Sequence, residues 1–367
     1  MILAGGEGSR LYPLTQQRAK PAVPFGGKYR LIDFALSNFI NSRIYSIYVL
    51  TQFKSQSLTE HLQESWRFSS ILRDHFILPV PAQKRTGESW YLGTADAIYQ
   101  NINLIEDGDF DIIAIFGADH IYRMDLQQMI DFHIRKRADV TISALPVSLK
   151  EATSFGVIQV QEKQRVTGFQ EKPKRPKPIP GKPDEAFASM GNYLFNKEVL
   201  IEMLYNDAKR LESSHDFGKD ILPRIFKDSR VFAYDFRRNR IPGITRKEIG
   251  YWRDVGTIQS FWEANMDLRN IQPEFNLYNK NWPIKTASYG TPPAKFVCSQ
   301  DGCQGQAVNS IVAEGSIISG GIVQDSIVGR EVSIDSGSKV INSMLMDRVK
   351  IGKNCKINMT IIDKDVE

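Results

Sequence analysis

The sequence predicts an α/β protein in which a doubly wound parallel sheet is followed by a β-helix. Over the first two thirds of the chain, short apolar runs alternate with segments of helical period, as in strand–helix–strand folds. From residue 306 onward, short apolar groups recur every five or six residues, as in hexapeptide repeats. The chain has 367 residues, of which 42% are hydrophobic and 24% charged, which is typical of a globular protein of two or three domains.

The expected strands of the first domain are apolar and rich in β-branched residues, which suits strands buried on both faces of a parallel sheet. Apolar residues at helical spacing lie between them, and Asp125 precedes one such segment as a suitable N-cap. Ligands of these sheets bind beyond the carboxyl ends of the strands. We expect strands at 44–51, 111–116 and 140–145, and helices carrying Leu31, Ala35 and Phe39, then Ala95, Ile98, Ile102 and Ile105, then Leu126, Met129, Ile130 and His133.

Three regions are expected along the chain: an α/β domain over 1–270, a proline- and glycine-containing linker over 271–305, and the β-helix over 306–367. The alternative for the last region is an ordinary antiparallel β domain, which the nearly constant period disfavours. The repeat continues to Glu367 without a capping segment. We therefore expect either a fragment that is truncated or a short β-helix whose end is closed by a partner subunit.

Charge and cysteine content restrict the class of protein. The net charge of +5 fits an anionic small ligand as well as nucleic acid, but we find no basic face interleaved with aromatic residues, so we expect no nucleic acid partner. No apolar run is long enough to cross a membrane, and the N-terminal residues lack the features of a signal peptide. The odd number of cysteines without metal-site spacing (Cys298, Cys303 and Cys355) indicates a reducing, cytoplasmic location.

The strongest chemical signal is a glycine-rich loop after the first predicted strand, with Gly5, Gly6 and Gly8 followed by Arg10 and Lys20. Backbone N–H groups of such a loop can approach phosphates closely. The two cations would neutralise a polyphosphate and stabilise a pyrophosphate leaving group. The alternative is a glycine turn with surface cations.

Two common nucleotide-binding motifs do not fit this chain. The dehydrogenase fingerprint starting at Gly6 would need glycine at position 11, where the chain has Leu11. A P-loop would need Ser or Thr after Gly27-Lys28, where the chain has Tyr29. The loop is therefore a phosphate loop of another kind.

A carboxylate follows the predicted strand 111–116, at Asp119, and a second one far along the chain, Asp254, lies in the segment YWRDVGT. Carboxylates at strand ends in such a fold can share one Mg²⁺, because hard oxygen ligands suit this ion. We expect His120 to support this site rather than to bind the metal. Lys172, at a strand end beside a turn, suits an anionic phosphomonoester, with a plain surface lysine as the alternative.

Several segments spread over the whole chain belong together: LAGGEGSRL, RAKPAVPFGGKYRLIDFALSN, TQF, GTADA, GADHIYRMD, FGV, EKP, SMGNY, SSHDFGKD and YWRDVGT. Together they resemble the ADP-glucose pyrophosphorylase family, also called glucose-1-phosphate adenylyltransferases. The pattern GGxGxR is common to all sugar nucleotidyltransferases, whereas RAKPAVPFGGKYRLIDF and SSHDFGKD are more specific to the adenylyl branch. The chain departs from many members in reading Gly117-Ala118-Asp119 for Ala-Gly-Asp, which leaves the carboxylate in place.

The resemblance implies a reaction of ATP with glucose 1-phosphate that gives ADP-glucose and pyrophosphate for glycogen or starch synthesis, with Mg²⁺ as cofactor. It also implies a left-handed β-helix, a homotetramer or heterotetramer, and control by phosphorylated metabolites. By the same resemblance, the catalytic residues are Arg10, Lys20 and Asp119, and the metal is held by Asp119 and Asp254. The nucleotide is expected to be bound by Gly5, Gly6, Gly8, Gln52, Gln83, Tyr91 and Gly93, and the sugar phosphate by Gly156, Glu171, Lys172, Ser189, Tyr193, Asp216 and Phe217. The expected effector residues are Arg18, Arg30 and Lys364.

The expected effector site differs from that of bisphosphate-activated enteric relatives. In those relatives a lysine immediately precedes the arginine that Arg18 matches, and here that position is Gln17. Glutamine supplies no charge, so a doubly phosphorylated ligand loses part of its neutralisation, and we expect a weaker response to it. Lys364 matches an effector lysine of the plant and cyanobacterial branch. The alternative is that Arg18 and Arg30 make only structural ion pairs.

Two rival functions share this fold. One is a sugar nucleotidyltransferase that uses UTP, dTTP or GTP. The other is a non-catalytic regulatory subunit, whose expected mark is the loss of the metal carboxylate or of the loop cations. The chain retains Arg10, Lys20, Asp119, Lys172 and Asp254, which favours a catalytic subunit.

Overall fold

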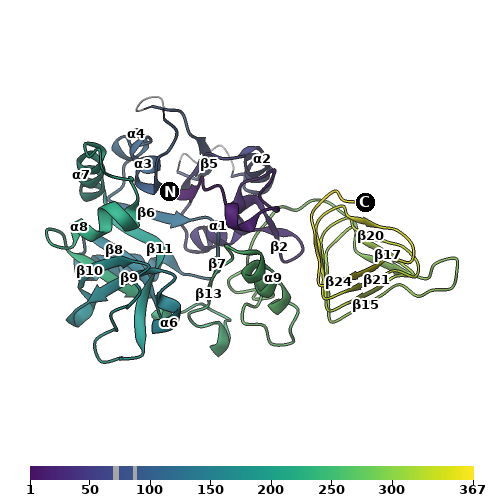
Figure 1. Cartoon of the computed structure of the whole chain (residues 1–367). Helices are drawn as coiled ribbons and strands as arrows, with labels where there is room; N and C mark the ends of the chain where they lie inside the picture. The colour runs from purple at the N-terminus through teal and green to yellow at the C-terminus, as the bar shows by residue number, and fades with distance from the viewer. Residues whose placement is uncertain (69–73, 86–88) are drawn as a thin grey trace.

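A computed structural model of the chain describes residues 1–68, 74–85 and 89–367. An α/β domain, drawn in purple to green, lies beside a β-helix, drawn in yellow (Figure 1). The predicted fold class is confirmed, with a parallel sheet at the centre of the first domain and parallel coils in the second.

The parallel part of the sheet has the order β5-β4-β1-β6, and strand order reverses at β1. The chain moves outward from β1 to β4 and β5, then returns to place β6 on the other side of β1. At such a switch point the carboxyl ends of neighbouring strands open a crevice. The bounds are β1 (Ile2–Ala4), β4 (Ser46–Thr51), β5 (Phe76–Pro81) and β6 (Ile112–Gly117).

The sheet continues beyond β6 through a long strand, β11 (Glu185–Asn196), which runs antiparallel to β6 and to β8 (Val140–Ser148). Strand β12 (Val231–Asp235) extends β8 in parallel. The first seven residues of β8 are buried, so its sequence has the same continuous apolar run as a parallel strand. The antiparallel ribbon at the edge consists of β9 (Gly156–Val160) and β10 (Val166–Glu171).

The helices that cover the sheet confirm two of the three expected positions and modify the third. Asp125 accepts a hydrogen bond from the N–H of Gln127 and caps α5 as predicted. The segment after Thr94 forms two short helices, because the side chain of Asn101 donates to the carbonyl of Ala97 in place of a helical N–H. The helices are α1 (Leu31–Asn41), α2 (Gln56–Ser65), α3 (Thr94–Tyr99), α4 (Asn103–Glu106), α5 (Leu126–Lys136), α6 (Leu149–Ala152), α7 (Lys197–Ala208), α8 (Leu222–Ile225) and α9 (Ile258–Asp267).

Short elements connect these parts and carry several polar side chains. The small pairs are β2 (Pro24–Phe25) with β3 (Tyr29–Arg30), and β7 (His120–Tyr122) with β13 (Trp252–Asp254). The single turns are 3₁₀ helices at Ser9–Leu11, Lys20–Ala22, Glu162–Gln164, Phe236–Arg238 and Arg246–Glu248, and a π-helical turn, η4, at Phe217–Ile221.

The C-terminal domain consists of three parallel sheets wound as coils, as a left-handed parallel β-helix requires, and the antiparallel alternative is wrong. The side chains of Ile318, Val323, Val328 and Ile334 fill its interior. The sheets are β14 (Lys295–Val297), β17 (Ile317–Ser319), β20 (Ser333–Ile334) and β23 (Lys350–Ile351); β15 (Gln306–Val308), β18 (Ile322–Gln324), β21 (Lys339–Ile341) and β24 (Lys356–Asn358); and β16 (Ile311–Val312), β19 (Ile327–Val328), β22 (Met344–Leu345) and β25 (Ile361–Ile362).

The segment predicted as a linker, 271–305, is packed at both ends. Phe275 and Ile284 are buried, and the guanidinium of Arg123 donates to the carbonyl of Trp282. Strand β14 lies within the same segment and pairs with β17, so it belongs to a β-helix sheet. The domain limits at 270 and 306 stay a prediction.

None of the helices within the described ranges has the length and apolar character needed to cross a lipid bilayer.

Neighbouring isoleucines of β17 test the packing of the β-helix. Ile318 is fully buried, whereas Ile317 is 45% exposed. We expect Ile318→Ala to lower the free energy of unfolding by about 2–5 kcal/mol, because it removes buried methyl groups and leaves a cavity. The matched variant Ile317→Ala should cost less than about 1 kcal/mol. Urea denaturation followed by circular dichroism measures both, and equal losses would contradict the packing described.

Candidate active site

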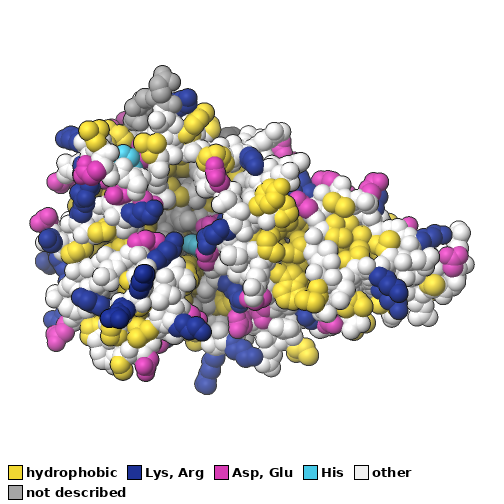
Figure 2. Space-filling view, viewed as in Figure 1, with side chains coloured by type: hydrophobic (Ala, Val, Ile, Leu, Met, Phe, Trp, Pro, Cys, Tyr) yellow, Lys and Arg dark blue, Asp and Glu magenta, His cyan; other side chains and the backbone are white. Residues whose placement is uncertain are grey.

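A cavity of about 710 Å³ opens at the carboxyl ends of β1, β4 and β6. Figure 2 shows the hollow in the α/β domain with Lys and Arg side chains near its rim. Most of the predicted site residues lie here, although their segments are far apart in the chain. The cavity is lined by Gly5, Gly6, Gly8, Arg10, Lys20, Gln52, Tyr91, Gly93, Asp119, Gly156, Glu171, Lys172, Ser189, Tyr193, Asp216, Phe217 and Asp254, among others.

The glycine loop packs directly on the aliphatic part of Lys20. Gly8 has a φ of 63°, in the left-handed region, and a Cβ there would lie 2.9 Å from the Cβ of Lys20. The hydroxyl of Thr15 donates to the carbonyl of Gly8 at 3.0 Å and fixes the turn. The loop and the lysine therefore form one unit in the wall of the cavity.

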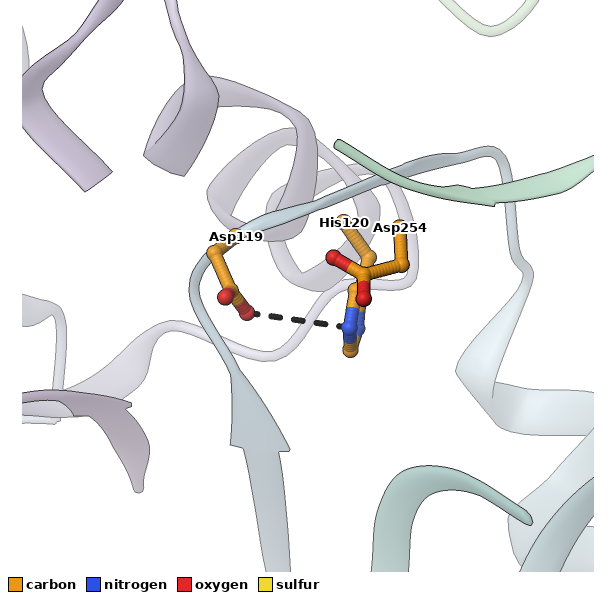
Figure 3. Close-up of side chains that lie close together, drawn as sticks. All are labelled: Asp119, His120 and Asp254. Carbon is orange, nitrogen blue, oxygen red and sulfur yellow. Dashed lines mark ion pairs between the residues drawn. The ribbon is translucent and has the colours of Figure 1, made fainter. Parts of the chain in front are cut away.

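Two carboxylates and an imidazole meet at the floor of the cavity (Figure 3). In the antiparallel pairing of β13 with β7, Asp254 lies opposite His120. Asp119, the residue that precedes His120, is therefore close to both. One ligand atom from each of the three side chains lies within 4.8 Å of the others. Nε2 of His120 is 3.8 Å from a carboxylate oxygen of Asp119.

The ammonium of Lys20 lies between the same two carboxylates. Its Nζ is 2.7 Å from Asp119 and 3.2 Å from Asp254. Burial alone would lower the pKa of Lys20, but the two carboxylates outweigh it and raise that pKa. Burial would raise the pKa of Asp119, and the opposing charges of His120 and Lys20 instead lower it to about 2.

The donor set of this floor suits a hard divalent cation such as Mg²⁺. Two carboxylates offer oxygen ligands, which Mg²⁺ prefers, and the remaining positions of that ion are usually filled by water and substrate phosphates. Nδ1 of His120 is buried and has no hydrogen-bond partner among the described residues. The residues present therefore fit the predicted metal.

The residues predicted for the nucleotide line the cavity, with one exception. Asn101 donates to the hydroxyl of Tyr91 at 2.8 Å, and Gly5 packs against Gln52. Gln83 is exposed and accepts from Arg85, and it is not among the described residues that line the cavity.

The residues predicted for the sugar phosphate line the same cavity. A Cβ on Gly156 would overlap the ring of Phe169, so β9 and β10 approach each other closely here. The ammonium of Lys172 is exposed and lies 3.5 Å from a carboxylate oxygen of Glu171. Tyr193 is buried in β11, which raises the pKa of its hydroxyl.

Several residues of the cavity had no predicted role. Trp252 lines it from β13, packs against the rings of His120 and Phe155, and has a buried Nε1 without a hydrogen-bond partner among the described residues. The sequence already indicated Trp252, because this residue lies in the segment YWRDVGT close to Asp254. Met190 and Gly191 line the cavity within the segment SMGNY.

The three predicted effector residues come from two domains. Arg18 is buried and makes a bidentate ion pair with Asp363, at 2.8 and 3.0 Å. Arg30 donates to the carbonyl of Ala22 and makes no ion pair within the described ranges. Burial and then the charges of Arg18 and Arg30 lower the pKa of Lys364, which places all three cations in one electrostatic cluster.

The fold and this cavity define a class of protein, and comparison with known families agrees. A nucleotidyl transferase model matches residues 1–271, and a model for the GlmU-like C-terminal hexapeptide matches residues 292–367. The chain is thus a nucleotidyltransferase with a hexapeptide-repeat domain.

Curated relatives narrow this class. A glucose-1-phosphate adenylyltransferase of Thermus thermophilus is 56% identical over 345 residues, which cover 93% of this chain and 83% of the relative. Proteins of the same name from Deinococcus radiodurans and Aliivibrio fischeri are 53% identical and cover 100% of this chain and 90% of their own length. The chain belongs to the glucose-1-phosphate adenylyltransferase family, as the resemblance implied.

Proposed function

We propose that this chain transfers the adenylyl group of ATP to glucose 1-phosphate, forming ADP-glucose for glycogen or starch synthesis and releasing pyrophosphate. One observation carries the proposal: the loop cations, both predicted metal carboxylates and the sugar-phosphate residues line a single cavity. The names of its relatives agree with it. The chain retains the loop cations Arg10 and Lys20 and the carboxylates Asp119 and Asp254, which disfavours a non-catalytic subunit.

A phosphate oxygen of glucose 1-phosphate attacks the α-phosphorus of ATP in line, the bond to the bridging oxygen breaks, and pyrophosphate leaves. No covalent enzyme intermediate is needed, so the protein acts by positioning and charge neutralisation. Arg10, whose side chain is 70% exposed, and Lys20, which is buried, would bind the β- and γ-phosphates. The glycine loop supplies backbone N–H groups beside them.

Asp119 and Asp254 would hold Mg²⁺, which supplies neutralisation of phosphate charge when bound. These two residues also keep the ammonium of Lys20 in place, at 2.7 and 3.2 Å. On the sugar side, Lys172 would bind the phosphate of glucose 1-phosphate, and Glu171, Ser189 and Asp216 would accept or donate hydrogen bonds to the sugar hydroxyls.

The proposed effector site lies where Arg18, Arg30 and Lys364 meet, between the two domains. An anion that binds Arg18 competes with Asp363, which already pairs with it. We also propose a homotetramer or heterotetramer, which is supported by exposed apolar side chains on the β-helix at Phe296, Val308 and Ile317. Free cysteines agree with a cytoplasmic location.

Pyrophosphate release across a panel of nucleotides and sugar phosphates tests the function. We expect ATP with glucose 1-phosphate to be the preferred pair, with UTP poorer by about a hundredfold or more in kcat/KM. A site that hydrogen-bonds a purine leaves buried polar groups unpaired when a smaller base enters. Comparable kcat/KM for UTP would favour the rival nucleotidyltransferase.

Asp119→Asn should keep the fold and reduce kcat by about 10²–10³, because it removes one charge from the metal site at nearly constant volume. Asp109→Asn, in an exposed position before β6, is the matched control and should retain full activity. Steady-state turnover in saturating Mg²⁺ measures both. Wild-type turnover of Asp119→Asn would show that this carboxylate does not serve the metal.

Lys172→Ala should raise the KM for glucose 1-phosphate by about tenfold to a hundredfold, since a charge-assisted hydrogen bond contributes about 1.5–3 kcal/mol. The KM for ATP should change little. Lys174→Ala, exposed two residues further along the same loop, is the control. An equal rise for both substrates would place Lys172 outside the sugar-phosphate site.

The response to effectors should favour a monophosphate or another small anion over fructose 1,6-bisphosphate, because Gln17 supplies no charge beside Arg18. Titration of each metabolite at subsaturating ATP measures this. Gln17→Lys should strengthen the response to the bisphosphate, whereas Gln16→Lys, in the neighbouring exposed position, should not. Strong activation of the wild type by the bisphosphate, unchanged by Gln17→Lys, would show that position 17 does not determine which effector the protein responds to.

A further inference from the structure

A five-residue loop, 213–217, leads to the wall of the cavity. Asp216 and Phe217 line the cavity and belong to the residues predicted for the sugar phosphate. The carboxylate of Asp216 accepts from the N–H groups of Gly218 and Lys219 at 2.9 and 3.0 Å, which caps the turn η4. Its other oxygen accepts from the hydroxyl of Thr94 at 3.0 Å. The direction of this carboxylate therefore depends on how the loop meets helix α3.

The backbone of His215 connects the loop to helix α3. Its carbonyl accepts from the N–H of Ala95 at 2.8 Å and from that of Asp96 at 3.3 Å, at the first turn of α3. A Cβ on Gly93 would overlap this carbonyl, so glycine is required at the approach. His215 itself has a φ of 53°, in the left-handed region, which is unfavourable for a residue with a side chain.

Asp207, at the end of α7, holds this backbone from the side away from the cavity. It is buried, and one carboxylate oxygen accepts from the hydroxyl of Ser213 at 2.7 Å. The other lies 2.7 Å from Nδ1 of His215. Ser213 in turn accepts from the N–H of His215 at 3.0 Å. Each oxygen of one buried carboxylate thus contacts a different residue of the loop, and the oxygen that accepts from Ser213 also lies 3.5 Å from Nη1 of Arg210.

We propose that Asp207 and His215 are positioning residues for the sugar phosphate: their contact holds the loop so that Asp216 and Phe217 face the substrate. Neither side chain is among the residues that line the cavity, so both act through their neighbours. The inference rests on the proposed function, because it assigns the sugar phosphate to this side of the cavity.

Two variants distinguish an effect of the contact between Asp207 and His215 from an effect of the left-handed backbone alone. Asp207→Asn keeps the volume but has one acceptor oxygen, so it cannot accept from Ser213 and His215 together. His215→Gly keeps a residue that tolerates the left-handed region but has no side chain to contact Asp207. If backbone tolerance alone mattered, this second variant would behave like the wild type.

We expect each variant to raise the KM for glucose 1-phosphate by about tenfold and the KM for ATP by less than about threefold. The double variant should raise the KM by less than the product of the two single effects, because both changes act on the same hydrogen-bonded group. Asp139→Asn is the matched control, since Asp139 also pairs with a base, Arg230, and lies outside the cavity. It should leave both KM values unchanged.

An equal rise for both substrates, or additive effects in the double variant, would overturn the proposal and leave a purely structural contact. Unchanged KM values in His215→Gly would overturn it as well, even if Asp207→Asn failed to fold. A failure of the proposed function would appear separately, as absence of pyrophosphate release by the wild-type protein with ATP and glucose 1-phosphate.

Discussion

The carboxylates of Asp119 and Asp254 lie side by side at the floor of the cavity with a cation between them. In this structure the ammonium of Lys20 is that cation, at 2.7 and 3.2 Å. Two like charges at this separation repel strongly in a partly buried site, and an ammonium shared by both removes the repulsion. Because the glycine loop packs on the stem of the same lysine, the phosphate side of the cavity depends on this charge balance.

The sequence was sufficient to predict that these carboxylates lie together, because strand ends in a doubly wound sheet converge. Asp119 follows β6 and Asp254 ends β13, and the pairing of β13 with β7 brings them together. The antiparallel direction of β11 was not predictable, since strands buried on both faces have the same apolar runs in either direction. The break between α3 and α4 depends on a single side-chain contact, from Asn101 to Ala97, which no periodicity reveals.

The limits of the residue-level predictions have similar causes. A motif identifies a segment, but the fold decides which side chains of that segment face the cavity. Trp252 lies in a segment that was recognised for Asp254, yet only the arrangement of β13 shows its ring beside His120. Gln83 lies in a loop away from the cavity, where its side chain pairs with Arg85. Arg18 was expected to bind anions, and the structure pairs it with Asp363 of the β-helix.

The β-helix also sets a limit on how the length of the chain can change. Ile311, Ile327, Met344 and Ile361 follow one another in register, one per coil. Adding or removing a residue within a strand turns each following side chain of that strand from the interior to the surface. Asp363 and Lys364 follow β25 directly. Insertions and deletions in the strands would therefore change which side chains face Arg18. We expect insertions and deletions to be tolerated only in turns where they do not shift the register of the following strand.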